Sequence, residues 1–239
     1  MRALTRTLVG AALLAVVAAP SQAVTFGVSG VASSNSTADV DFAYDGVNKI
    51  TVSITNTASV SPDPRITGFA FNIPSAVTGL SLFSASGTAN NAGWFGIFNP
   101  NDINTPTPLG DYDLGASTGN PNAGNFPNPP IATSGDINGG FPNAGIEQGE
   151  TGVFMFTLTG TDLDLLTAAS FLDLGPDGGS TDNFFAVRFQ RLDDNGVTSD
   201  VGVPTTDTAV PLPAALPLMG GAIAVFGGLA FRRRQRADA

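Results

Sequence analysis

Carboxylates are the main side chains in this sequence that could perform acid–base chemistry. The 239 residues include no histidine and no cysteine, which excludes Ser-His-Asp and Cys-His nucleophiles and metal sites built from imidazole or thiolate. A glycosidase needs only two carboxylates, and Glu147 and Glu150 are the only glutamates. Both lie in the glycine-rich segment 145–152, where an exposed turn is expected. We therefore predict no catalytic residue and no enzymatic activity, with a carboxylate-dependent glycan hydrolase as the weaker alternative.

Aspartate-rich turns could also bind a hard cation such as Ca²⁺, which prefers carboxylate and carbonyl oxygens on loops. The segments with this composition are Asp111-Tyr112-Asp113, Asp173 to Asp177, and Asp193-Asp194-Asn195. None has the spacing of an EF-hand loop. Aspartate and asparagine are also ordinary turn residues, because their side chains bond the nearby backbone. A structural calcium site is compatible with the sequence, but no metal ligand and no cofactor is predicted.

An aromatic group could instead bind sugar rings by stacking. Trp94, the only tryptophan, lies close to Phe95 and Phe98 and near asparagine-rich segments. A carbohydrate-binding module would need these rings exposed, whereas a lone tryptophan more often belongs to a core or anchors a loop. The formal charge of −10 and the pI near 4.1 argue against nucleic acid as a partner, because a phosphate backbone requires a Lys/Arg surface.

The N-terminal residues have the parts of a secretory signal peptide, predicted over 1–23. Arg2 and Arg6 form a positive region, and residues 8–17 form an apolar stretch that is too short to span a bilayer. A small residue at position 23 predicts cleavage by signal peptidase between Ala23 and Val24. The exported chain would then begin at Val24.

The C-terminal segment 205–239 has the composition of a membrane anchor preceded by a motif. A five-residue motif leads into an apolar run over 215–231 and a basic tail over 232–239. The motif consists of Val210, Pro211, Leu212, Pro213 and Ala214, and the basic residues of the tail are Arg232, Arg233, Arg234 and Arg236. As a helix the apolar run would be roughly 25 Å long, just enough for a thin membrane. The arginines would stop transfer and hold the tail in the cytoplasm.

This order of motif, glycine-containing helix and arginine cluster resembles the PEP-CTERM family of bacterial sorting signals, in its VPLPA variant. The resemblance covers residues 210–236 and implies that an exosortase, a membrane enzyme, cuts near the motif and removes the anchor. It also implies a Gram-negative bacterium that makes exopolysaccharide. The alternative is a plain single-span anchor with a proline-rich neck. No threonine follows Leu212-Pro213 in the spacing of an LPxTG signal, so a cell-wall sortase is not expected.

Residues 24–204 are predicted to form one exported all-β domain, an antiparallel β-sandwich with long Gly/Asn/Pro-rich loops. Apolar residues alternate with polar residues at a period of two, as in strands with one buried face, over 40–44, 50–54, 69–73, 154–158 and 185–189. Segments 50–56, 68–72, 149–156 and 186–190 also look like ectodomains found ahead of this sorting signal, which implies a β-sandwich without catalytic residues. Four basic and nineteen acidic side chains over 24–209 give this part a charge of −15, which would repel anionic polymers.

Two stretches of this domain do not have the strand pattern. Residues 99–143 contain eight prolines and nine asparagines, which predicts long loops or an extended insertion that buries little surface. A short helix is predicted over 162–169, with Thr161 as its N-cap and Asp164 three residues later.

The function predicted from these observations is that of a non-enzymatic surface or extracellular-matrix protein, with a structural or interaction role in exopolysaccharide or biofilm. Its expected processing partners are the export machinery, signal peptidase and an exosortase-type membrane enzyme. Extracellular polysaccharide is its candidate ligand. The C-terminal helix would anchor the chain in the inner membrane before processing, and the processed protein would be at the cell surface or outside the cell. A carbohydrate-binding module is the alternative.

Overall fold

The structure is a computed structural model in which residues 22–33, 35–59, 63–87, 93–105, 109–119, 131–137, 140–177, 181–194, 197–205 and 210–211 are described. Its strands are β1 (Gln22–Gly30), β2 (Thr37–Tyr44), β3 (Lys49–Asn56), β4 (Arg65–Phe71), β5 (Val77–Gly87), β6 (Trp94–Asn104), β7 (Asp111–Thr118), β8 (Ile131–Ala132), β9 (Thr151–Gly160), β10 (Phe185–Asp194), β11 (Val197–Pro204) and β12 (Val210–Pro211). The helical elements are η2 (Pro142–Ala144), η3 (Leu163–Leu165), α1 (Ala169–Leu172) and η4 (Thr181–Asn183). The predicted all-β class is confirmed.

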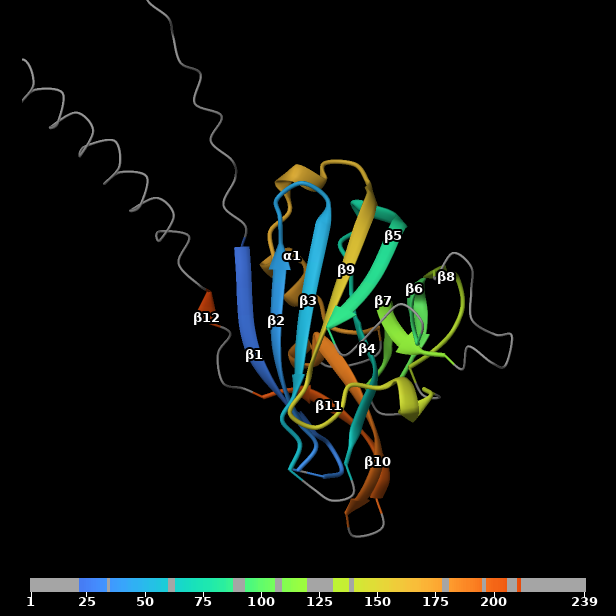
Figure 1. The fold of residues 1–239 in the computed structure, drawn as a ribbon. Coiled ribbons are helices and arrows are strands. Elements are labelled where there is room, and N and C mark those ends of the chain that lie inside the picture. The colour runs from blue at the N-terminus through green and yellow to red at the C-terminus, as the bar shows by residue number, and fades with distance from the viewer. Residues whose placement is uncertain are drawn as a thin grey trace, which may run out of the picture.

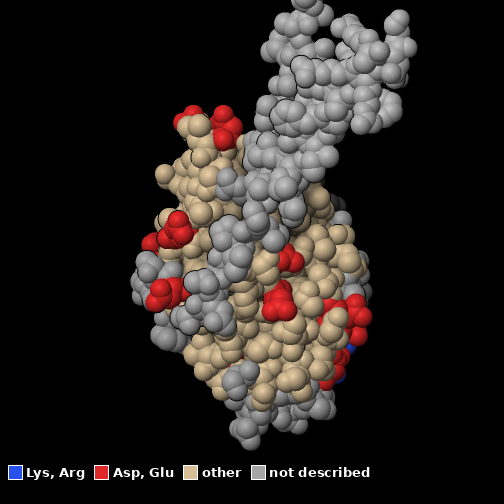
Figure 2. Space-filling view, turned by 90° about the vertical axis from the view of Figure 1, so that its left-hand side faces the viewer, with Lys and Arg blue, Asp and Glu red and all other residues tan. Residues whose placement is uncertain are grey.

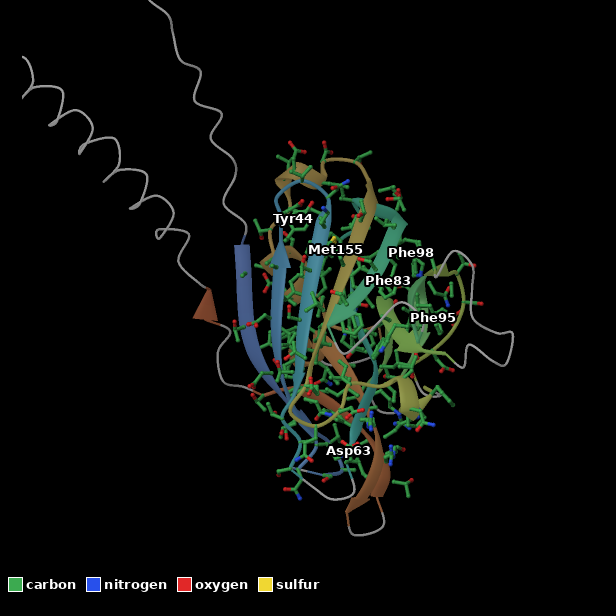
Figure 3. All side chains as sticks on the ribbon, in the orientation of Figure 1. Tyr44, Asp63, Phe83, Phe95, Phe98 and Met155 are labelled. Carbon is green, nitrogen blue, oxygen red and sulfur yellow. The ribbon has the colours of Figure 1, made fainter. Side chains whose placement is uncertain are left out.

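The strands form one continuous sheet in the order β5-β9-β3-β2-β1-β11-β10-β4-β7-β6-β8, and β12 also pairs with β1. This differs from the predicted sandwich of two sheets, because β1 pairs with β2 on one edge and with β11 on the other, so no free edge divides the layers. The sheet curls until its ends meet (Figure 1). A Cβ on Gly96 of β6 would lie 2.9 Å from the ring of Phe83 on β5, and Figure 3 labels Phe83 together with Phe98 of β6 at this meeting point.

The curled sheet encloses an aromatic core. Its largest buried rings come from strands far apart in the sequence and from α1: Phe42, Tyr44, Phe69, Phe71, Trp94, Phe154, Phe156, Phe171, Phe185 and Phe189. The ring of Phe69 lies 4.7 Å from that of Phe154 and 5.7 Å from that of Phe185. Since each buried aromatic removes a large apolar area from water, this core supplies much of the driving force for folding.

A second cluster of buried residues covers the outer face of part of the sheet. It consists of Ala70, Ile97, Ile103, Leu109, Tyr112, Ile137, Ala186 and Val201. Ala70 lies between Phe69 and Phe71, which contact the aromatic core, so it points to the opposite face of β4. Ile137 packs onto the same strand, since its Cβ lies 3.0 Å from the position that a Cβ on Gly68 would take.

The prediction that 99–143 forms long loops or an extended insertion with little buried surface is wrong for β6 and β7. Strand β6 extends to Asn104, and β7 runs through Asp111–Thr118 with seven of its eight residues buried. The small residues Gly115 and Ala116 let β7 pack closely against its neighbours. A Cβ on Gly115 would lie 2.3 Å from the backbone oxygen of Phe69. A strand buried on both faces has no alternating pattern, and this one is not rich in large apolar residues.

The predicted helix over 162–169 is also wrong. Asp162 adopts a left-handed conformation with φ 54°, and Leu166 is extended with ψ 156°. Only the single 3-10 turn η3 therefore forms between them, and the α-helix α1 begins later, at Ala169. The predicted cap, Thr161, instead donates its backbone N–H to the carbonyl oxygen of Ala76 at 3.0 Å.

Candidate functional site

The predicted signal-cleavage site and the start of the predicted sorting motif lie side by side along one edge of strand β1. Val24 pairs with Pro211 of β12, and Thr25 pairs with Val210. The chain therefore enters and leaves the described fold at the same edge (Figure 1). We take this β1–β12 edge as the candidate functional site, because it joins residues from both predicted processing segments.

The bond between Ala23 and Val24 lies inside β1. Ala23 pairs with Ala43 of β2, and Val24 pairs with Phe42. The side chain of Val24 is buried against the aromatic core. A peptidase that cleaves this bond would therefore have to act before β1 joins the sheet.

Most of the other predicted targeting residues lie outside the described part of the chain. This applies to the motif residues Leu212, Pro213 and Ala214 and to the stop-transfer residues Arg232, Arg233, Arg234 and Arg236, and equally to the predicted helix 215–231 and to residues 1–21. No helix within the described ranges combines the length and the apolar character that a membrane crossing requires.

The two glutamates do not share a buried pocket. Glu147 is exposed, and its Oε1 accepts a hydrogen bond from Nη1 of Arg65 at 2.6 Å. Asp63 contacts Nη2 of the same guanidinium at 2.6 Å. Glu150 is exposed as well and closes a turn, with its N–H donating to the carbonyl oxygen of Glu147 at 3.1 Å. This arrangement fastens the 145–149 turn to β4 and lacks the apolar surroundings that a catalytic acid needs.

Two of the three aspartate segments do come together. Asp111 and Asp177 exchange backbone hydrogen bonds of 3.2 and 3.1 Å. The side-chain amide of Asn101 lies between two carboxylates, and with its Nδ2 turned toward them it donates to Asp177 at 3.0 Å and to Asp113 at 3.1 Å. Asp113 also accepts from the backbone N–H groups of Asn101, at 2.7 Å, and Ile73, at 3.0 Å.

These contacts give the carboxylate of Asp113 a structural task. It closes the bulge that β6 makes between Phe98 and Ile103 by binding the backbone N–H of Asn101. Of the other candidates, Asp173 follows α1, Asp193 and Asp194 end β10, and Asn195 lies outside the described residues. In the described part of the chain, no group of three or more acidic side chains is arranged to hold a metal ion.

Trp94 is part of the aromatic core and does not form an exposed platform. Its side chain is fully buried, its ring lies 4.6 Å from that of Phe154, and its Nε1 donates to the carbonyl oxygen of Ala144 at 2.8 Å. The rings of Phe95 and Phe98 are partly buried and pack against different clusters. The interpretation of Trp94 as a core residue is therefore confirmed.

A face rich in hydroxyl groups covers the outside of β3 and β9, with Lys49 at one end of it, opposite Thr157. It is formed mainly by hydroxyl side chains, and we call it the hydroxyl face: Thr51, Ser53, Thr55, Thr151 and Thr157. These residues alternate with the core residues of the same strands and are each only partly buried. Met155, labelled in Figure 3, lies on the same face opposite Thr51. Around the neighbouring β1 side, Figure 2 shows isolated acidic side chains on a mostly uncharged surface.

Sequence reasoning missed the residue of β1 that faces the motif. Thr25 is an exposed strand residue whose Oγ1 donates to Asp41 at 2.6 Å. Nothing in its local sequence indicates that it pairs with a residue 185 positions later.

No known protein-family model, no curated protein and no solved structure matches the chain.

Proposed function

We propose that the chain is an exported surface or matrix protein whose C-terminal segment is a sorting signal read by a membrane-bound processing enzyme of the exosortase type. The observation that carries the proposal is the pairing of Val24 and Thr25 with Pro211 and Val210. A domain that leaves the membrane behind an N-terminal signal and stays attached by a C-terminal anchor has both ends directed toward the same membrane. Adjacent strands at the two ends support that arrangement.

The chemistry of the described domain supports a contact role rather than catalysis. Its glutamates are exposed, its only tryptophan is buried, and Asp113 is occupied by backbone donors. The hydroxyl face offers short donors and acceptors without charge, which suits hydrogen bonding to the hydroxyls of a neutral polysaccharide. The net charge of −15 over 24–209 opposes an acidic one. We therefore place the protein in a matrix of extracellular polysaccharide.

The test is the intact mass of the protein recovered from the culture medium and from the membrane fraction of the bacterium that makes it. The wild type should yield a medium form that begins at Val24 and ends near residues 210–214. The double variant Pro211→Ala with Pro213→Ala should lose this form and accumulate in the membrane. Pro204→Ala, which changes a proline of β11 outside the motif, serves as the matched control and should be processed normally.

A full-length tail that stays in the membrane in all three proteins would overturn the proposal and leave residues 210–231 as a plain anchor. Loss of processing in the Pro204→Ala control as well would show that the effect comes from a damaged fold rather than from a damaged motif.

A further inference from the structure

The far edge of β1 is occupied by two successive parts of the C-terminal chain. Strand β11 pairs with the later part of β1, where Val28 faces Pro204, and the pairing continues to Thr205, whose N–H donates to the carbonyl oxygen of Gly27 at 2.9 Å. Residues 206–209 lie outside the described part, and the next pairing along β1 is that of Val210 with Thr25. Position 210 comes three residues later than an uninterrupted register would place opposite Thr25, so β12 is a separate contact and not the end of β11.

The backbone of Thr25 faces β12 rather than β2. Alternate residues of a strand direct both their N–H and their C=O to the same neighbour. Gly27 accepts from Thr205 and Val31 donates to Val201 at 2.9 Å, so the odd-numbered residues of β1 face the C-terminal segment. Gly30 donates to Ser36 at 2.7 Å, on the opposite side. Thr25 is odd-numbered, and its pair with Val210 is therefore the hydrogen-bonding pair.

The position of Pro211 in the motif matches this alternation of hydrogen-bonding directions along β1. Val24 faces β2, so its pair with Pro211 is a pair without hydrogen bonds between the two residues. Proline has no N–H to donate and is tolerated only at such a position on an edge. A shift of the motif by one residue would place Pro211 opposite Thr25, where an N–H is required. Val210 followed by Pro211 is thus the order that this edge accepts.

We propose that β1 holds the first two residues of the sorting motif as a detachable strand, and that the processing enzyme acts only on molecules in which β12 has left β1. This inference rests on the function proposed above. While Val210 is paired with Thr25, one edge of its backbone is occupied and cannot enter an enzyme site as an extended strand. Since the contact consists of two residue pairs, it is weak enough to open without unfolding the domain.

The geometry supplies a variant that tests this without touching the motif. Thr25→Pro removes the N–H that faces Val210, whereas the hydrogen bonds between β1 and β2 come from the even-numbered residues and remain. Thr25→Ala is the matched control, because it also loses the side-chain bond to Asp41 but keeps the backbone N–H. Thr205→Pro is a second variant, which removes the N–H that Thr205 donates to Gly27 and lies away from the signal-cleavage site.

The experiment is a pulse–chase measurement of loss of the C-terminal tail in the producing bacterium, combined with hydrogen exchange at the Val210 amide in the detergent-extracted precursor. In the wild type and in Thr25→Ala, we expect the Val210 amide to be protected and processing to be equally fast. In Thr25→Pro, protection should be lost and processing should accelerate about fivefold, the factor that corresponds to one net hydrogen bond of about 1 kcal/mol. Thr205→Pro should change both readouts in the same direction.

Each outcome decides a different question. An unprotected Val210 amide in the wild type would overturn the docking itself. Loss of protection in Thr25→Pro with an unchanged processing rate would overturn the requirement for detachment. If no tail is removed from the wild type, or if removal is unaffected by Pro211→Ala with Pro213→Ala, the proposed function fails, while the exchange measurement still tests whether β12 is docked.

Discussion

Two parts of the same sheet differ in whether other residues cover their outer side. In the exposed part, formed by β2, β3 and β9, buried residues alternate with exposed or partly exposed ones along most of each strand, and the outer side of β3 and β9 carries the hydroxyl face. In the covered part, formed by β4 and β7, residues on both sides are buried, and the second cluster packs over the outer side. The strands are paired in an antiparallel register in both parts. The difference lies in what the rest of the chain places on top of them.

This difference gives the two parts different roles: the covered part contributes to stability, and the exposed part is the surface for contact with a partner. The covered part is closed to partners by Ile137 and its neighbours. The exposed part keeps its hydroxyl face partly exposed, and it is linked through β2 to the β1–β12 edge. The proposed contact with polysaccharide and the proposed processing would thus both take place on the part of the sheet in which buried residues alternate with exposed ones.

The largest expected difference between the two parts is the effect of a charge on their outer surfaces. Ala186 of β10 belongs to the second cluster and is fully buried, whereas Ala43 is on the outer side of β2 and partly exposed. Ala186→Asp should destabilise the protein by about 3 kcal/mol or more, because the carboxylate loses its hydration. Ala43→Asp should cost less than about 1 kcal/mol. Urea unfolding measures both, and equal losses would show that the second cluster is not a true core.

The same contrast explains which strands could be predicted from the sequence. Ile50, Val52 and Ile54 alternate with hydroxyl residues because one side of β3 meets water, and this leaves a clear period of two. In β7, Leu114 is followed by Gly115 and Ala116, and burial on both sides removes that period. The local sequence contains proline and asparagine nearby, so it resembles a loop. Tertiary packing, which no short window contains, makes it a strand.

The candidate site was predictable only in part, for a related reason. Targeting motifs such as Val210 to Ala214 are recognisable because they are contiguous. The contact between Thr25 and Val210 depends on a long-range pairing, and so does the grouping of Asp113 with Asn101 and Asp177. The sequence marks Asp113 as a candidate cation ligand, but only the fold shows that the backbone N–H groups of Asn101 and Ile73 occupy its oxygens.

A medium-sized effect is expected from the two tyrosines, one in each cluster. Tyr44 contacts the aromatic core and its hydroxyl donates to the carbonyl of Leu163 at 2.7 Å, while Tyr112 in the second cluster donates to that of Asn183 at 2.6 Å. Removing either hydroxyl leaves a carbonyl without this donor. Tyr44→Phe and Tyr112→Phe should therefore each cost about 1–2 kcal/mol at neutral pH, which thermal unfolding would measure.

The tyrosines also predict the response to alkaline pH. Burial, reinforced by the negative charges of Asp45 and Asp164, raises the pKa of Tyr44 from 10.0 to about 12, and burial raises that of Tyr112 as well. The folded state favours the neutral form of the tyrosine. The contribution of this preference to the free energy of unfolding is therefore fully present below pH 10 and is lost as the pH rises toward 12. Tyrosinate absorbance should appear together with the change in Trp94 fluorescence on unfolding. Ionisation near pH 10 with the fold intact would contradict the burial of that tyrosine.

The smallest effect is expected on the hydroxyl face. Thr55 and Thr151 share a hydrogen bond of 2.8 Å across β3 and β9 in a partly exposed position, where water can replace a lost partner. Thr55→Val should therefore change the free energy of unfolding by less than about 0.5 kcal/mol. Its matched variant in the covered part is Thr118→Val, since Thr118 is buried and its Oγ1 accepts from the N–H of Phe141 at 2.6 Å.

Thr118→Val makes the same change in side-chain shape as Thr55→Val. Because Thr118 is buried, however, the change leaves the N–H of Phe141 without its acceptor where water is excluded. It should cost about 1–2 kcal/mol. Urea unfolding of the two variants side by side compares the same chemical change with and without water nearby. If the Thr55 variant lost as much stability as the Thr118 variant, the hydroxyl face would be part of a packed interface and could not be the free surface on which contact with polysaccharide depends.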